Sequence, residues 1–228
     1  MKLNLKYNLF GVLFVVTTSA FAPANNTFTA AEQQQISIAT PDLFSRSNAI
    51  SIDLGILNDN EYSFPLPVGK AELTDNRQAF TIKTKEGDVV KAMFAGVVRL
   101  SRNVNGYGNV IVIRHDNGLE TVYANNAQNL VKVGQKVSAG RSIAIVGSEG
   151  GKTYCKFSIM VNGGYINPET VLEVRSHKLR KQTLLCTKNG RYVDVAVKDG
   201  SKANTNKKSK KNDIDPENPF ENANTFKL

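Results

Sequence analysis

Between residues 80 and 172, apolar positions gather in short runs rich in β-branched residues, and polar residues or glycines separate the runs. Runs of this kind predict β-strands. The turn Asp116-Asn117-Gly118, which stands between two of the runs, is typical of a β-hairpin. We therefore predict an all-β fold, an antiparallel β-sheet or sandwich with short loops. The predicted strands cover residues 89–93, 96–100, 110–113, 120–123, 142–146 and 156–161.

A further hairpin is expected beyond this domain, as a C-terminal extension in residues 174–199. Its two apolar runs, residues 184–187 and 192–197, flank the turn dipeptide Asn189-Gly190. In residues 200–228, a run of lysines precedes an acidic end rich in Asn and Pro. This composition predicts a disordered tail. The lysines could serve solubility or contact anionic polymers of the cell envelope.

The first 22 residues have the layout of a secretory signal peptide. Lys2 and Lys6 precede an apolar run from Leu9 to Val16, and Ala20-Phe21-Ala22 is a small-x-small cleavage site. We therefore expect export to the periplasm or the medium after cleavage near Ala22, with no transmembrane segment in the mature chain. Residues 23–60, rich in Asn, Gln, Ser, Thr and Ala, are predicted to form a linker or a poorly packed N-terminal arm.

The net charge indicates which kinds of partner to expect, and the cysteines raise the question of a disulfide. The formal charge is +9, and removal of Lys2 and Lys6 leaves +7 on the mature chain. A basic surface favours anionic partners, and export favours the cell wall, the membrane surface or an acidic protein over nucleic acid. The two cysteines, Cys155 and Cys186, belong to what should be an oxidising compartment. They could form a disulfide or remain two buried thiols, and the sequence leaves both options open.

Four sequence pieces occur in order between residues 61 and 173. They are Phe64-Pro65-Leu66-Pro67, then Gly87-Asp88 continuing to Val98, then Gly106-Tyr107-Gly108-Asn109 continuing to Ala124, and last Val131 to Gly140 with Ile166-Asn167-Pro168-Glu169. This string resembles the LytM/lysostaphin-type peptidoglycan metalloendopeptidase domain. The resemblance implies a LytM-like β-sheet domain over residues 61–173, with peptidoglycan or its stem peptides as a ligand. It also implies a cell-wall amidase or another envelope protein as a partner.

The same resemblance locates a zinc site that has lost its ligands. Active members bind zinc through a His, an Asp four residues later and the second His of a His-x-His pair. The first His of that pair and a His after Tyr-Ala serve catalysis. Carried over, the first two positions hold Arg77 and Thr81, Asn125 follows Tyr123-Ala124, and the pair reads Tyr154-Cys155-Lys156. We therefore predict no catalytic residue, no metal and no cofactor. The predicted binding groove contains Arg77, Thr81, Tyr123, Asn125, Tyr154 and Lys156.

The remaining residues support the same expectation. The chain has only two histidines. We expect a structural role for His115, and His177 lies among basic residues that disfavour a cation. No carboxylate is evident near Arg77 and Lys156, and one positive charge about 5 Å from a divalent cation opposes it by roughly 6–7 kcal/mol at an effective dielectric near 20. Cys155 should point to the opposite sheet face, into the core.

Three functions follow from these patterns. The favoured interpretation is a non-catalytic LytM-type protein of the cell envelope that binds peptidoglycan or activates a cell-wall hydrolase such as an amidase. One alternative is an active zinc endopeptidase with atypical ligands. The other is a biotinyl- or lipoyl-like structural or adaptor barrel, because Val131 to Gly140 also resembles the turn of such modules.

Overall fold

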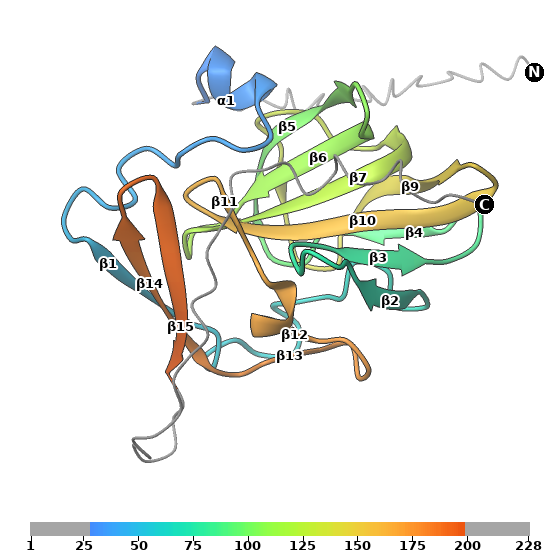
Figure 1. Ribbon diagram of the computed structural model, residues 1–228. Coiled ribbons are helices and arrows are strands. Elements are labelled where there is room, and N and C mark those ends of the chain that lie inside the picture. The colour runs from blue at the N-terminus through green and yellow to red at the C-terminus, as the bar shows by residue number, and fades with distance from the viewer. Residues whose placement is uncertain (1–27, 199–228) are drawn as a thin grey trace, which may run out of the picture.

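The computed structural model describes residues 28–198, and these residues form a mostly β structure built on one large antiparallel sheet (Figure 1). The main path of this sheet runs β2-β3-β10-β9-β7-β6-β5-β8, with β4 paired to β9 and β11 paired to β10. The predicted all-β antiparallel fold is confirmed. Its strands are β2 (Lys70–Leu73), β3 (Phe80–Lys83), β4 (Val89–Lys91), β5 (Gly96–Val104), β6 (Gly108–Arg114), β7 (Leu119–Asn129), β8 (Lys136–Val137), β9 (Ser142–Glu149), β10 (Lys152–Val161) and β11 (Gly164–Ile166).

Each of the six predicted apolar runs lies on one of these strands. The turn at Asp116-Asn117-Gly118 joins β6 to β7, and Arg114 pairs with Glu120 across it. Gly118 has φ of 90°, a conformation that residues with a side chain rarely adopt. The local turn chemistry therefore determines this hairpin.

Both faces of the central strands are covered. On β7 and β10, Tyr123, Phe157 and Ile159 belong to the larger core cluster. Their neighbours Val122 and Met160 belong to a second cluster on the other face. Because side chains alternate along a strand, each of these strands contributes to two cores at once.

The N-terminal arm is packed, which differs from our expectation of a linker or a poorly packed segment. Its first element is α1 (Ala30–Gln34), which Thr29 and Glu32 cap through reciprocal hydrogen bonds. Its second element is β1 (Ala49–Asp53), and Ile52 on this strand is 2% exposed. The expectation of poor packing rested on the low aromatic content of the arm. A few apolar residues of the arm are nevertheless buried against other parts of the chain.

The partner of β1 is the C-terminal hairpin that the sequence predicted. β14 (Thr183–Asn189) and β15 (Tyr192–Lys198) pair through the turn at Asn189-Gly190, and β1 adds to β14 to make a three-stranded sheet. The N-terminal arm and the C-terminal hairpin thus pair with each other beside the large sheet (Figure 1). The segment that connects the large sheet to this hairpin contains a short 3-10 helix, η1 (Pro168–Thr170), and the small strand pair β12 (Leu172–Glu173) and β13 (Lys178–Leu179).

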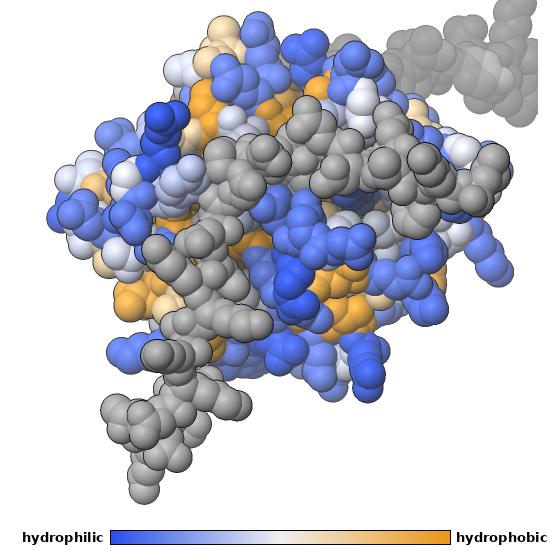
Figure 2. Space-filling view, in the orientation of Figure 1, coloured by the Kyte–Doolittle hydropathy of each residue, from blue (hydrophilic) through white to orange (hydrophobic). Residues whose placement is uncertain are grey.

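The predicted signal peptide and tail lie outside the described residues. Within residues 28–198, no helix is long and apolar enough to cross a membrane. The face shown in Figure 2 is largely hydrophilic, with apolar patches between polar side chains. Single exposed apolar residues are ordinary on protein surfaces.

A buried ion pair connects the arm to the sheet. Arg99 on β5 and Glu120 on β7 have fully buried side chains and form two hydrogen bonds, of 2.7 Å from Nε and 3.0 Å from Nη2. Arg99 also donates to the main-chain carbonyls of Gln35 at 2.8 Å and Ile36 at 2.6 Å. Its guanidinium thereby holds the end of α1 against the sheet.

Two further charges complete this network. Arg114 on β6 donates to Glu120 at 2.8 Å and to the Glu32 carboxylate at 2.7 Å. The Arg99 guanidinium also donates to the main-chain carbonyl of Glu32. Bidentate contacts between arginine and carboxylate are among the stronger polar contacts in proteins.

Loss of one member of the buried pair should be costly. We expect Arg99→Met to lower the free energy of unfolding by about 3–5 kcal/mol, because the Glu120 carboxylate would stay buried without its main partner. Urea unfolding measures this change. The matched control is Lys83→Met, which breaks an exposed pair with Glu72 and should cost less than about 1 kcal/mol. Equal losses in the two variants would contradict the prediction.

Candidate functional site

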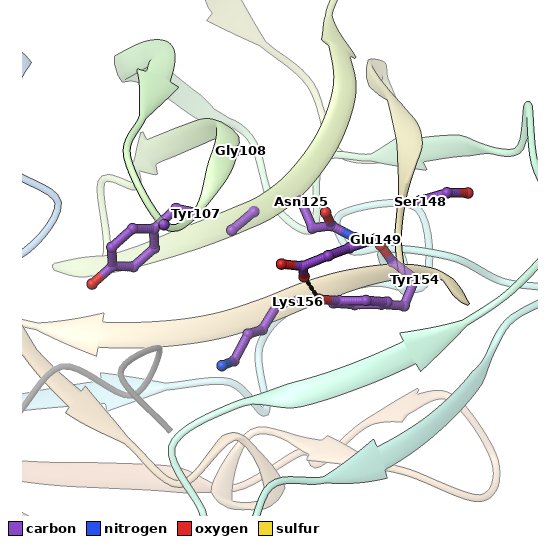
Figure 3. A pocket seen from close by; sticks show the side chains of 9 residues that line it. Tyr107, Gly108, Asn125, Ser148, Glu149, Tyr154 and Lys156 are labelled. Carbon is purple, nitrogen blue, oxygen red and sulfur yellow. Dashed lines mark hydrogen bonds between the residues drawn. The ribbon is translucent and has the colours of Figure 1, made fainter. Parts of the chain in front are cut away.

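A pocket of about 290 Å³ opens where the β5–β6 turn, β7 and the β9–β10 hairpin meet. Figure 3 shows its side chains and the strands that carry them. Three of the six predicted groove residues line it: Asn125, Tyr154 and Lys156. The lining consists of Gly106, Tyr107, Gly108, Ala124, Asn125, Ser148, Glu149, Tyr154 and Lys156.

The other predicted groove residues lie elsewhere. Thr81 on β3 pairs with Lys156 on β10 in the sheet register, so it neighbours the pocket without lining it. Arg77 lies in the turn before β3 and is not among the lining residues. Tyr123 lies in the core, as the next paragraph describes.

Tyr123 cannot be a binding residue of the groove wall, which corrects our prediction. It is fully buried, and its hydroxyl accepts a hydrogen bond of 2.7 Å from the Met93 amide. Burial raises the pKa of this hydroxyl well above its usual value. The reason for its position is strand alternation: Ala124 faces the pocket beside Lys156, so its neighbour Tyr123 faces the opposite core.

Asn125 holds the walls of the pocket together. Its backbone has φ of 62°, a left-handed conformation that Asn tolerates better than most residues. Its amide N–H donates to the Tyr107 carbonyl at 2.9 Å, and its side-chain Nδ2 donates to the Tyr154 carbonyl at 2.8 Å. A side chain at Gly147 would meet the Asn125 carbonyl at 2.4 Å, so the glycine permits this close approach.

Lys156 supplies a buried cation to the pocket. The residue is only 9% exposed. Burial lowers the pKa of its ammonium group to about 8, and the negative charge of Glu149 partly opposes that shift. The ammonium group is therefore mostly charged at neutral pH, in surroundings that disfavour the charge.

Tyr154 lies beside Lys156 on β10, and Glu149 lines the pocket from the end of β9. The Tyr154 hydroxyl donates a hydrogen bond to the Glu149 carboxylate, drawn as a dashed line in Figure 3. Burial, and then this hydrogen bond, raise the pKa of Tyr154 above its usual value. Glu149 was not among the residues that the sequence indicated, because it lies outside the positions that the family motif compares. Its place beside Gly150-Gly151, at the tip of a hairpin, was the only signal.

Carboxylates accompany both cations, which corrects a second expectation. Arg77 is paired with Glu169 at 2.6 Å, and Glu149 lies in the pocket that contains Lys156. The sequence does not reveal these carboxylates, because the fold brings Glu169 to Arg77 and places Glu149 in the same pocket as Lys156. Charge repulsion against a metal ion is therefore weaker than we expected.

The donor set nevertheless does not fit zinc. Within the part of the chain that the structure describes, no three His, Cys, Asp or Glu side chains are grouped so that they could hold a metal ion. At the compared positions, the Asn125 amide donates to main-chain carbonyls and the Tyr154 hydroxyl donates to Glu149. Lys156 offers no lone pair while it is charged. No chemical step can therefore be derived through a metal at this pocket.

Both histidines make structural contacts. His115 is 4% exposed, and its Nδ1 lies 2.8 Å from the Ala95 carbonyl, which can only accept, so Nδ1 carries the proton. Nε2 then accepts from the Thr121 hydroxyl at 2.8 Å. His177 stacks on Phe64 with ring centroids 4.0 Å apart. The structural role expected for His115 agrees with these contacts.

The two cysteines are unpaired and buried. Cys155 belongs to the larger core cluster, on the face opposite the pocket, as strand alternation predicted. Burial raises the pKa of its thiol to about 12, which suppresses the reactive thiolate. Cys155 is therefore a core residue.

One segment of the chain matches a known protein family. Residues 75–168 match Peptidase family M23. This M23 segment contains most of the large sheet and every predicted groove residue. It also includes residues 131–140, so the turn that suggested a biotinyl or lipoyl module is accounted for by the M23 match.

Curated relatives match about two fifths of the chain. The murein hydrolase activator EnvC of Escherichia coli (strain K12) is 39% identical over 94 residues, covering 40% of this chain and 22% of that protein. The murein hydrolase activator NlpD of the same strain is 36% identical over 96 residues, covering 41% of this chain and 25% of that protein. The chain thus spans about a quarter of the length of these relatives.

Enzymes also occur among the similar proteins. The DD-carboxypeptidase/endopeptidase Mpg of Neisseria meningitidis serogroup B is 36% identical over 88 residues, covering 38% of this chain and 20% of that protein. Among solved structures, the antimicrobial peptidase lysostaphin from Staphylococcus simulans has a TM-score of 0.45 at 24% identity, covering 50% of this chain and 54% of that chain.

The environment of His115 makes stability depend on pH. Burial lowers its pKa to about 4 in the folded protein, against an ordinary value of 6.5. The unfolded chain therefore binds the proton first as the pH falls, and stability present above pH 6.5 is lost between pH 6.5 and 4. Between pH 7 and pH 5 this loss amounts to about 2 kcal/mol. Urea unfolding at the two pH values should show a smaller difference for His115→Gln than for the parent protein, and an unchanged difference would contradict the assignment.

Proposed function

We propose that the chain is a non-catalytic M23-type protein of the cell envelope, which binds peptidoglycan or activates a cell-wall hydrolase such as an amidase. The observation that carries this proposal is the composition of the pocket. An amide that ties the walls together, a phenol bound to Glu149 and a buried ammonium group stand where the family resemblance places metal-binding and catalytic side chains. Such a pocket can recognise a ligand, and among the described residues it has no group of metal donors through which a zinc ion would activate water.

The relatives support the regulatory side of the proposal. EnvC and NlpD are both named murein hydrolase activators, and each is at least 36% identical to the part of the chain that it matches. Mpg, which is named as an enzyme, is 36% identical over a stretch of similar length. Overall identity therefore does not separate activators from enzymes, and the side chains of the pocket favour the activator.

Export and partners belong to the same proposal. A signal peptide in residues 1–22 would deliver the chain to the periplasm or the medium, where murein and its hydrolases lie. The mature charge of +7, from the formal +9 less Lys2 and Lys6, would favour contact with anionic wall polymers or acidic partners. An active zinc endopeptidase is the outcome that would overturn the proposal.

Release of label from murein tests this function. Purified chain alone should release no label from dye-labelled murein, with or without added zinc, because the pocket lacks metal donors. Together with an amidase of the same organism, it should raise the release rate by about fivefold or more, as coupled sites commonly do. The amidase alone is the baseline, and Glu86→Gln, a change at an exposed glutamate far from the pocket lining, should activate like the parent chain.

Two results would contradict this expectation. One is release of cross-linked fragments by the chain alone, together with stoichiometric zinc in the purified protein. The other is the absence of both activation and murein binding with every amidase of the organism.

A further inference from the structure

The pocket combines a deep positive charge with a negative charge at its mouth. Lys156 is 9% exposed, whereas Glu149 is an exposed residue at the tip of the β9–β10 hairpin. Both line the same pocket, together with Tyr107 and Tyr154. In the view of Figure 3, Lys156 and Glu149 lie between the two tyrosine rings, and the lysine side chain points away from the Glu149 carboxylate. The two charges are thus arranged in depth.

The size of the pocket limits the ligand. A volume of about 290 Å³ corresponds to roughly ten water molecules at about 30 Å³ each. This space is large enough for an amino acid or the end of a peptide. The apolar rings of Tyr107 and Tyr154 can pack against the body of such a ligand, and the polar groups can orient its ends.

We propose that this pocket binds a free α-amino acid group, with the ligand carboxylate against Lys156 and the ligand ammonium group toward Glu149. This inference rests on the proposed function, since it takes the pocket to be a recognition site without a metal, and it deepens that function by naming the ligand chemistry. A free amino acid and the end of a murein peptide share this group.

The depth of each charge predicts its contribution. Burial disfavours the charged form of Lys156 and lowers its pKa to about 8, and a ligand carboxylate beside the ammonium group would favour that charged form. Charges in low-dielectric surroundings interact strongly, whereas exposed pairs are screened. The carboxylate should therefore provide most of the affinity. The ammonium group should add a smaller preference through Glu149.

Binding of D-alanine and N-acetyl-D-alanine to the purified full chain, measured by NMR titration, tests both contacts. The two probes carry the same carboxylate, and only D-alanine carries the ammonium group. The parent chain should bind both probes and should prefer D-alanine by about two- to fivefold, the range of an exposed ion pair. Lys156→Met should weaken the binding of both probes by at least about tenfold, as the loss of a buried charge partner does.

The variants separate the two charges. Glu149→Gln should abolish the preference for D-alanine and leave binding of N-acetyl-D-alanine unchanged. Because Glu149 is exposed, this variant should fold even if Lys156→Met does not. The matched controls are Glu86→Gln and Lys136→Met, which change exposed residues outside the pocket lining and should bind like the parent chain.

The outcomes distinguish this inference from the proposed function. No binding of either probe, or a preference for D-alanine that survives Glu149→Gln, overturns the inference, while activation of an amidase could still stand. Cleavage of murein by the chain alone overturns the proposed function instead. If both probes bind as expected, the affinity of the parent chain for a soluble muropeptide with a free α-amino acid end is compared with its affinity for D-alanine. Tighter binding of the muropeptide shows that the natural ligand is a murein peptide. Equal binding shows that it is a free amino acid.

Discussion

Arg99, which is buried in an ion pair with Glu120, joins the N-terminal arm to the sheet across more than 60 residues of sequence. The two charges of this pair come from β5 and β7, and Arg114 on the intervening β6 adds a third. The same guanidinium binds main-chain carbonyls at the end of α1. Because buried charges need such partners, the arm must stay on the sheet for the pair to be satisfied. The N-terminal arm is therefore part of the domain.

The second constraint is that β7 and β10 have two buried faces. One face carries Tyr123 and Cys155 into the larger core, and the other carries Ala124 and Lys156 to the pocket. A shift of one residue in either strand would exchange these roles. The position of Lys156 therefore follows from the packing of its neighbours.

Under the proposed function, the pocket keeps the scaffold of the M23 segment and changes its chemistry. The hairpins that surround it belong to the M23 segment, and Asn125 bonds two of its walls to β7. The charged groups that line the pocket are the buried Lys156 and the exposed Glu149, and Glu149 accepts a hydrogen bond from the Tyr154 hydroxyl. This combination suits recognition of a small charged group better than activation of water.

Local patterns in the sequence were sufficient to predict the strands and the hairpin turns. Strand alternation and turn dipeptides act between neighbours, so the β fold and the core position of Cys155 could be predicted.

Tertiary structure alone decided which distant groups meet. It paired Arg77 with Glu169, placed Glu149 in the pocket of Lys156, and added β1 to β14. It also placed the Tyr123 side chain in the core and not in the groove. The pairing of Arg77 with Glu169 and of β1 with β14 joins residues far apart in the chain, and the energies of such contacts depend on burial and on the path of the whole sheet. A sequence pattern does not contain that information, because it reports only which residues are near one another along the chain.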